Sequence, residues 1–163
     1  MSLAKSFNYN GRTVDIELLQ SVQTPGAEQA VELALVTQLP RKVTGIQKMI
    51  QRYTMLLLSA LGTVKFAPEQ GTTLLSTVAG GGLQTGSASF IFTAASSGVV
   101  LAMQDEDRAY DAATKTTTPD DERIVSASLI DFTVDYARAT LVLNVQITNA
   151  AGTATVFVVP VSA

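Results

Sequence analysis

The C-terminal part of this chain limits its possible folds more than any other stretch, because it contains three consecutive β-rich runs. The runs cover residues 124–136, 140–147 and 153–161. In the middle run apolar residues recur at every second position, which is typical of a strand: Leu141, Leu143, Val145 and Ile147. The connections at 137–139 and 149–152 are short enough to be hairpins. We therefore expect an antiparallel β-meander.

Residues 44–62 predict a helix. Thr44 with Gln47 fits a capping box, and Gly62 fits a left-handed residue that ends the helix. We expect Ile50 and Leu57 to be core residues. Apolar residues line one helix face at spacings of three and four: Ile46, Met49, Ile50, Tyr53, Leu57, Ala60 and Leu61.

A short strand over 63–66 and a sharp turn should follow this helix, since Pro68 and Gly71 break the alternation. The span 70–104 then contains no charged residue. A second helix is expected from near Thr85 or Ser87 to about residue 113. A helix without charge on any face is enclosed by protein on more than one side. We therefore expect Phe90 and Ile91 to face a partner or the core, and the span to be loosely ordered outside an assembly.

The N-terminal part predicts β-structure. Asn10 and Gly11 form the preferred two-residue turn, so 7–9 and 12–18 should form a hairpin. Residues 31–35 alternate as a strand does, although a helix over 27–36 is an almost equal alternative. The expected fold is α+β: an antiparallel β-meander sheet packed against two main helices, with an N-terminal β-hairpin extension. The extension covers 1–40, and an α+β domain covers 41–163.

Composition argues against most kinds of catalysis. The chain has 163 residues, a net charge of -3, no cysteine and no histidine. It therefore lacks thiolate metal ligands, a cysteine nucleophile and the commonest general base. We expect no catalytic residue, cofactor or metal. The N-terminus has no apolar run of the kind that a secretory signal needs.

Charge is unevenly distributed along the chain. Residues 41–65 carry five cations and no acid, whereas 105–123 are rich in acids. The two runs are either solvated surfaces or complementary docking faces for partner subunits. The basic run is too small, and too poor in interleaved aromatics, to predict nucleic-acid binding.

The helix and turn described above resemble the baseplate wedge family of contractile-tailed phages, often labelled lysozyme-like, and its counterpart in type VI secretion baseplates. A second point of resemblance is the acidic-Pro-Arg-Ile element that this family places before such a meander. Arg123 and Ile124 match that element, Asp121 stands for its Glu, and Glu122 replaces its Pro. The resemblance covers about residues 44–161. The positions matched around the turn are Leu61, Gly62, Pro68, Gly71, Thr72 and Leu74.

The resemblance implies a structural subunit of the tail baseplate, present in the virion and assembled in the host cytoplasm. Its partners would be other wedge subunits, the tail sheath protein, and tail tube or hub proteins, with no nucleic acid and no membrane. Arg123 would make charge-assisted hydrogen bonds to a partner. The C-terminal sheet would help to seed the sheath by strand addition, and the apolar run 156–161 is either buried on both sides or a free edge. The expected partner contacts are Pro68, Gly71, Asp121, Glu122, Arg123, Phe90 and Ile91.

The sequence fits two other function classes less well. A cell-wall glycosidase needs two opposed carboxylates, for which Glu69 and Glu122 are the candidates, but nothing in the sequence places such a pair. A membrane-associated protein could use 83–103, which has the right length but is rich in Ser, Thr, Gln and Gly. The Gly-rich run 81–87 has Ser87 where a phosphate loop needs Lys, so we interpret it as a connector.

Overall fold

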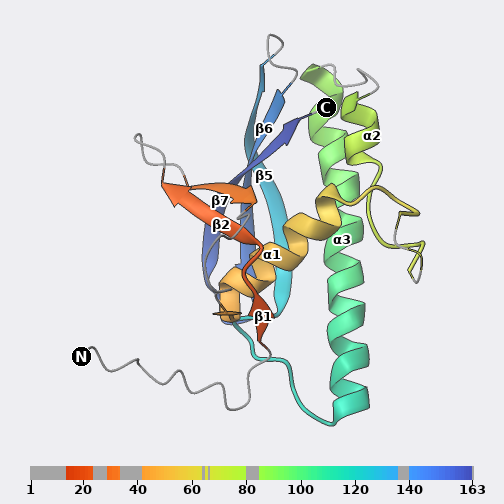
Figure 1. Cartoon of the computed structure of the whole chain (residues 1–163), viewed down its shortest axis with the longest axis vertical. Helices are drawn as coiled ribbons and strands as arrows, with labels where there is room; N and C mark the ends of the chain where they lie inside the picture. Colours follow the sequence, from red (N-terminus) through yellow and green to blue (C-terminus); the bar gives the residue numbers. More distant parts are fainter. Residues whose placement is uncertain are drawn as a thin grey trace.

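The computed structural model describes residues 14–23, 29–33, 42–63, 65, 67–79, 85–135 and 140–162. Within these residues the chain forms helices and strands in an α+β arrangement, as predicted (Figure 1). Their bounds are β1 Asp15–Ile16, β2 Leu19–Gln23, β3 Gln29–Leu33, β4 Lys42–Val43, α1 Gly45–Leu58, α2 Leu74–Ala79, α3 Thr85–Thr114, β5 Ile124–Asp135, β6 Thr140–Asn149 and β7 Ala154–Ser162.

The main sheet has five strands in the order β2-β3-β7-β6-β5. Strands β5, β6 and β7 pair antiparallel in sequence order, which confirms the predicted meander. Strand β3 pairs parallel with β7, with Ala30 opposite Val158. Strand β7 therefore lies between β3 and β6, so the expectation of a free edge is wrong. Burial on both sides holds only in part, because Val156 is 46% exposed. The end strands of the sheet are β2 and β5.

The helices cover one face of this sheet. In Figure 1, α1 crosses in front of the sheet, α3 runs along its side, and α2 lies beside the N-terminal half of α3. Tyr53 of α1 packs edge-on against Phe157 of β7, with ring centroids 6.2 Å apart. Its hydroxyl lies 2.7 Å from Ser96 Oγ, and burial raises the pKa of Tyr53 to about 12. The largest buried apolar side chains come from both the helices and the sheet: Tyr53, Phe92, Phe157, Met49, Leu57, Leu74, Met103, Ile124, Leu141, Leu143 and Ile147.

Helix α1 differs from its prediction at both ends. Thr44 makes no side-chain cap hydrogen bond, so the predicted capping box is absent. The helix ends at Leu58, a turn earlier than expected, because the chain then leaves to form a parallel bridge between Ala60 and Thr72. As a result Leu57 is fully buried, Ile50 is only half-buried, and Leu61 is more than half exposed.

The turn after α1 is present, but the described residues of the strand predicted before it are not in a strand. Thr63 and Lys65 lie in no strand, while positions 64 and 66 fall outside the described residues. The Gln70 amide donates to the Ala67 carbonyl at 3.0 Å, which closes a turn around Pro68. Gly71 has φ +104°, and a Cβ added there would lie 2.7 Å from the Ser59 carbonyl oxygen. This glycine lets the returning chain approach the end of α1.

Two glycine-to-alanine changes should therefore shift stability in opposite directions. Gly71→Ala introduces both a strained backbone and a clash, and should lower the free energy of unfolding by at least about 1 kcal/mol. Gly98→Ala lies within α3 with open space around the added Cβ, and should raise it by up to about 1 kcal/mol. Denaturant melts of both variants test this, and a neutral Gly71→Ala would contradict the turn geometry.

The remaining elements divide into predicted and unpredicted ones. The second predicted helix is confirmed as α3, whereas α2 was not expected. The predicted strand over 31–35 is confirmed as β3, which excludes a helix there, and it pairs with the unpredicted β2. The hairpin turn at Asn10 and Gly11 lies outside the described residues. Of residues 14–18, the described part of the predicted strand 12–18, only β1 is a strand, and it pairs with β4. Strands from the first 40 residues thus pair with strands beyond them.

Candidate functional site

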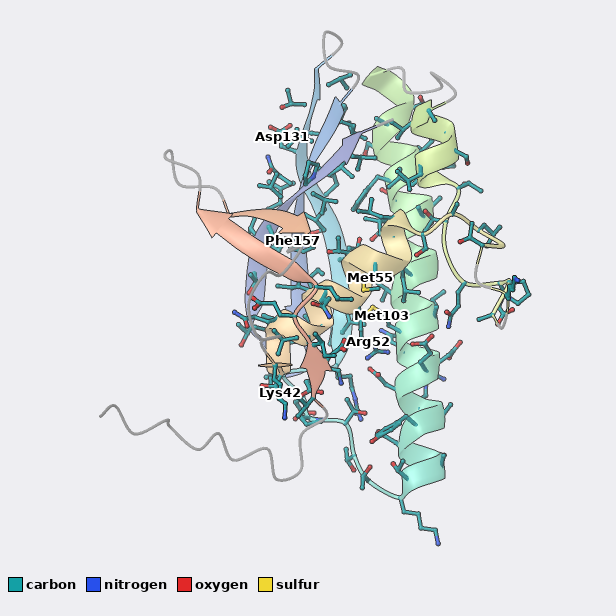
Figure 2. All side chains as sticks on the ribbon, viewed as in Figure 1. Lys42, Arg52, Met55, Met103, Asp131 and Phe157 are labelled. Atoms are coloured by element: carbon teal, nitrogen blue, oxygen red, sulfur yellow. The ribbon has the colours of Figure 1, made fainter. Side chains whose placement is uncertain are left out.

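A network of ion pairs joins α1 to the C-terminal half of α3. Arg52 lies between the two helices (Figure 2) and donates to two adjacent carboxylates. Its Nη1 is 2.8 Å from Asp107 Oδ1, and its Nη2 is 3.0 Å from Glu106 Oε2. Gln70 also donates to Glu106. Burial acts against the charge of Arg52, but these carboxylates outweigh it and raise the pKa of the guanidinium. The network therefore fixes α1 against α3.

Glu122, an expected partner contact, lies inside the fold. It is almost completely buried and accepts a hydrogen bond from the Gly45 amide at 3.1 Å. Lys48 Nζ lies 3.3 Å from its other carboxylate oxygen. A carboxylate at a helix N-terminus satisfies amides that have no partner within the helix and interacts favourably with the helix dipole. Glu122 thus fills the capping position that the sequence assigned to Thr44.

Arg123 also has a partner within the chain. Its Nη2 lies 2.7 Å from Asp111 Oδ2 near the end of α3. The Thr118 amide and hydroxyl both donate to Asp111 Oδ1 at 2.7 Å. Hydrogen bonds from Thr118, together with the charge of Arg123, lower the pKa of Asp111. Asp111 therefore ties the loop after α3 to the start of β5.

The lowered pKa of Asp111 predicts a particular pH dependence of stability. Because the folded-state pKa lies below that of the unfolded chain, the stabilisation is complete above the unfolded value and is lost as pH falls through the folded value. Asp111→Asn should therefore be less stable than the natural chain at neutral pH, and the difference should shrink below about pH 4. Thermal melts across pH test this. Asp105→Asn, which removes an exposed pair with Arg108, is the control and should change little at any pH. A pH-independent loss in Asp111→Asn would contradict the proposed role of charge.

The other predicted contact residues do not gather into one site. Pro68 is exposed in its turn, and Gly71 packs against the end of α1. Asp121 is half-buried beside the start of β5. Phe90 is 77% exposed on α3, and Ile91 packs partly against the core. Only the segment from Asp121 to Arg123 meets the α1–α3 network.

The surface around the network is hollowed on two sides of Asp107. A pocket of about 540 Å³ is lined by Val14, Lys48, Arg52, Glu106, Asp107, Tyr110 and Thr118. A second pocket, of about 450 Å³, is lined by Gln104, Asp107, Arg108, Asp111, Arg123, Ile124 and Val125. The described residues contain no cluster of three metal-ligating side chains. Glu69 and Glu122 are the two carboxylates considered for a glycosidase. Glu69 is exposed in a turn, whereas Glu122 is bound to Lys48, so the two have different local environments.

Sequence reasoning missed the central residues of this network: Arg52, Asp107 and Asp111. The signal that could have found them is the pairing of the basic run 41–65 with the acidic run 105–123. Arg52 binds Glu106 and Asp107, and Lys48 binds Glu122, so much of the charge complementarity is satisfied within one chain. Sequence alone does not show whether such runs meet within a molecule or between molecules.

No protein-family model, curated protein or solved structure matches this chain. Its function must therefore be argued from its own surface.

The outward face of α3 is the most unusual part of that surface. Phe90 is 77% exposed and Leu101 is 58% exposed, with only small or hydroxyl-bearing exposed residues between them: Thr93, Ala94, Ser97 and Gly98. By length and composition alone, Ser87–Thr114 could cross a membrane, a test that core helices also pass. Asp105, Glu106, Asp107, Arg108 and Asp111 lie within that same segment.

Proposed function

We propose that this protein is a structural subunit of a phage contractile-tail baseplate, where it joins larger wedge subunits and helps to seed the tail sheath. The observation that carries the proposal is the charge-free outward face of α3. A surface with exposed Phe90 and Leu101 and no charge over several turns is typical of a face that a partner covers. The resemblance of residues 44–161 to the wedge family indicates that this partner is another baseplate subunit.

The hydroxyl groups on this face support a protein partner. Thr93 Oγ1 donates to the Ser89 carbonyl at 2.7 Å, so its donor is already used within the helix. Such a face can be covered without leaving that hydrogen-bonding group unsatisfied. The acids at 105–107 and 111 favour a protein neighbour over a membrane for the C-terminal half of α3. Asp107 pairs with Arg52 of α1, and Asp111 pairs with Arg123, just before β5.

Strand addition to the sheet is proposed at β2 instead of β7. Strand β5 has features by which natural edge strands avoid pairing. It carries irregularities near Val125 and Ile130, and Gln104 Nε2 lies 3.3 Å from the carbonyl oxygens of both Ile124 and Val125. Strand β2 is the other end strand. An incoming strand of the sheath protein would extend the sheet there through backbone hydrogen bonds.

The proposed location is the virion tail, after assembly in the host cytoplasm, with wedge, sheath, and tube or hub proteins as neighbours. No role in nucleic-acid binding, membrane insertion or catalysis is proposed. The family's contact at its acidic-Pro-Arg-Ile element would change in this chain, because Glu122 and Arg123 are engaged by Lys48 and Asp111. We therefore assign the main assembly contact to α3 and not to this element.

Purified tail particles test the proposal. We expect the chain to co-purify with intact tails, and cryo-electron microscopy to place α3 against another subunit. Leu101→Glu should abolish incorporation while leaving the isolated protein folded, because Leu101 is exposed. Val125→Glu, at an exposed site on β5, is the matched control and should be incorporated normally. Absence of the chain from tails, or peptidoglycan clearing that is lost in Glu69→Gln, would overturn the proposal.

A further inference from the structure

The segment from Val14 to Leu18 is extended, with its apolar side facing outward. Val14, Ile16 and Leu18 are 40%, 52% and 41% exposed, whereas the alternate residues Asp15 and Glu17 are half-buried. Side chains at every second position of a strand share one side. This orientation is the reverse of the usual one, in which a strand at the surface turns its polar side to water.

The backbone of this segment is held by a side chain of α1. Gln51 Nε2 donates to the Ile16 carbonyl at 2.8 Å, and Gln51 Oε1 accepts from the Leu18 amide at 2.7 Å. In a parallel sheet, a residue of the neighbouring strand makes the same two hydrogen bonds. One is to the carbonyl just before a given residue, and the other is to the amide just after it; here that residue is Glu17. Gln51 is almost fully buried, so its position is fixed. Its side-chain amide therefore takes the place of a neighbouring strand.

Gln51 occupies one backbone edge of the segment from Val14 to Leu18, and β4 occupies the other. An added strand therefore has no free edge to pair with. A partner must therefore bind through the outward side chains. Val14, Ile16 and Leu18 span about 13 Å along the strand. Apolar residues at positions i, i+4 and i+7 of a helix span about 10 Å, which is a comparable length.

The pocket of about 540 Å³ begins at Val14, at one end of this apolar stripe. Inside it, Arg52 is shared by Glu106 and Asp107. Lys48 also lines the pocket but is paired with Glu122, so this linked group has two cations and three acids and carries a net charge of -1. Asp107 is only 5% exposed, and its Oδ2 has no hydrogen-bond partner among the described residues. A buried carboxylate oxygen without a donor is unfavourable and is a place for a cation or donor to bind. Tyr110, half exposed in the same pocket, adds an aromatic face for a cation.

We propose that the stripe of Val14, Ile16 and Leu18, together with this pocket, is a docking site for an amphipathic helix of another protein that carries a Lys or Arg at one end of its apolar face. The apolar residues of that helix cover the stripe, and the cation enters the pocket beside Glu106 and Asp107. Gln51 is the positioning residue that keeps the stripe extended. The site is separate from the outward face of α3, and it does not require the protein to belong to a tail.

Two synthetic peptides test this inference by NMR titration of the full chain. Both carry leucine at positions i, i+4 and i+7, and they differ only in lysine or glutamate at the flanking position. We expect the lysine peptide to shift the amide signals of residues 14–18 and Tyr110 saturably below about 1 mM, and to bind about tenfold more tightly than the glutamate peptide. Equal binding of the two peptides, or no binding of the lysine peptide up to that concentration, would overturn the inference.

Variants identify the two halves of the site. Ile16→Ser should weaken binding about tenfold, while Leu101→Ser, an equally exposed change on α3, should leave it unaltered. Asp107→Asn, checked for a native spectrum, should remove the preference for lysine. Unchanged binding in Ile16→Ser would exclude the stripe. Shifts at residues 14–18 on dilution of the protein alone would identify a second copy as the occupant instead.

Discussion

Leu57→Ala is expected to lower the free energy of unfolding by about 2 to 5 kcal/mol. Leu57 is fully buried where α1 meets the sheet and α3, so truncation removes apolar contacts and leaves a cavity. Ile50→Ala should have a smaller effect, because Ile50 only partly covers the core from the side of the same helix. Urea melts of the isolated protein measure both changes.

Leu61→Ala provides the matched control, since the same side chain is removed from an exposed position just after α1. It should change stability by no more than about half a kcal/mol. If Leu57→Ala were as mild as Leu61→Ala, the face of α1 would not be packed in the isolated chain. That result would mean that the core forms only on assembly.

Glu122→Ala is expected to destabilise the fold by about 3 kcal/mol, because it leaves the Lys48 ammonium and the Gly45 amide without their shared acceptor. Loss of a carboxylate at a helix start also removes its interaction with the helix dipole. The expected observation is a lower urea midpoint with an unchanged slope, because the exposed surface on unfolding stays the same.

The double variant Lys48→Met/Glu122→Leu removes both charges of the ion pair. It therefore separates the effect of losing the pair from the effect of leaving the Lys48 charge without Glu122. It should recover much of the stability lost in Glu122→Ala, since apolar replacement of a buried pair is often tolerated. Glu69→Ala, in an exposed turn, should be nearly neutral. A double variant no better than Glu122→Ala would show that the cap of α1, and not the lysine that has lost this acceptor, dominates the effect.

Sequence was a good guide where one pattern persists over many residues. The alternation within β6 and the uninterrupted run of α3 both predicted their elements, because each pattern is long compared with a turn. The end of α1 was not predictable, since it depends on a bridge between Ala60 and Thr72 across a loop. Helix α2 has only six residues, too few for a periodic pattern to appear.

The candidate site was less predictable than the fold. The charges of Arg52 and Asp107 are visible in the sequence, but 55 positions separate them, and nothing local indicates that they meet. Glu122 was expected at a partner surface because of the resemblance, whereas the fold buries it against α1. Gln51 carries no charge and belongs to no motif, so its bonds to Ile16 and Leu18 could be found only in three dimensions.

The parallel pairing of β3 with β7 determines the order in which the protein can complete its fold during synthesis. Ala30 and Val158 lie far apart in the sequence, so the residues between them must be synthesised before the two strands can meet. Pairs so distant in sequence form slowly, because a large loop must close first. Until then β2 and β3 form a two-stranded hairpin, which is marginally stable at best and has open edges. The nascent N-terminal strands are therefore the part of this molecule most exposed to misassembly and to capture by chaperones.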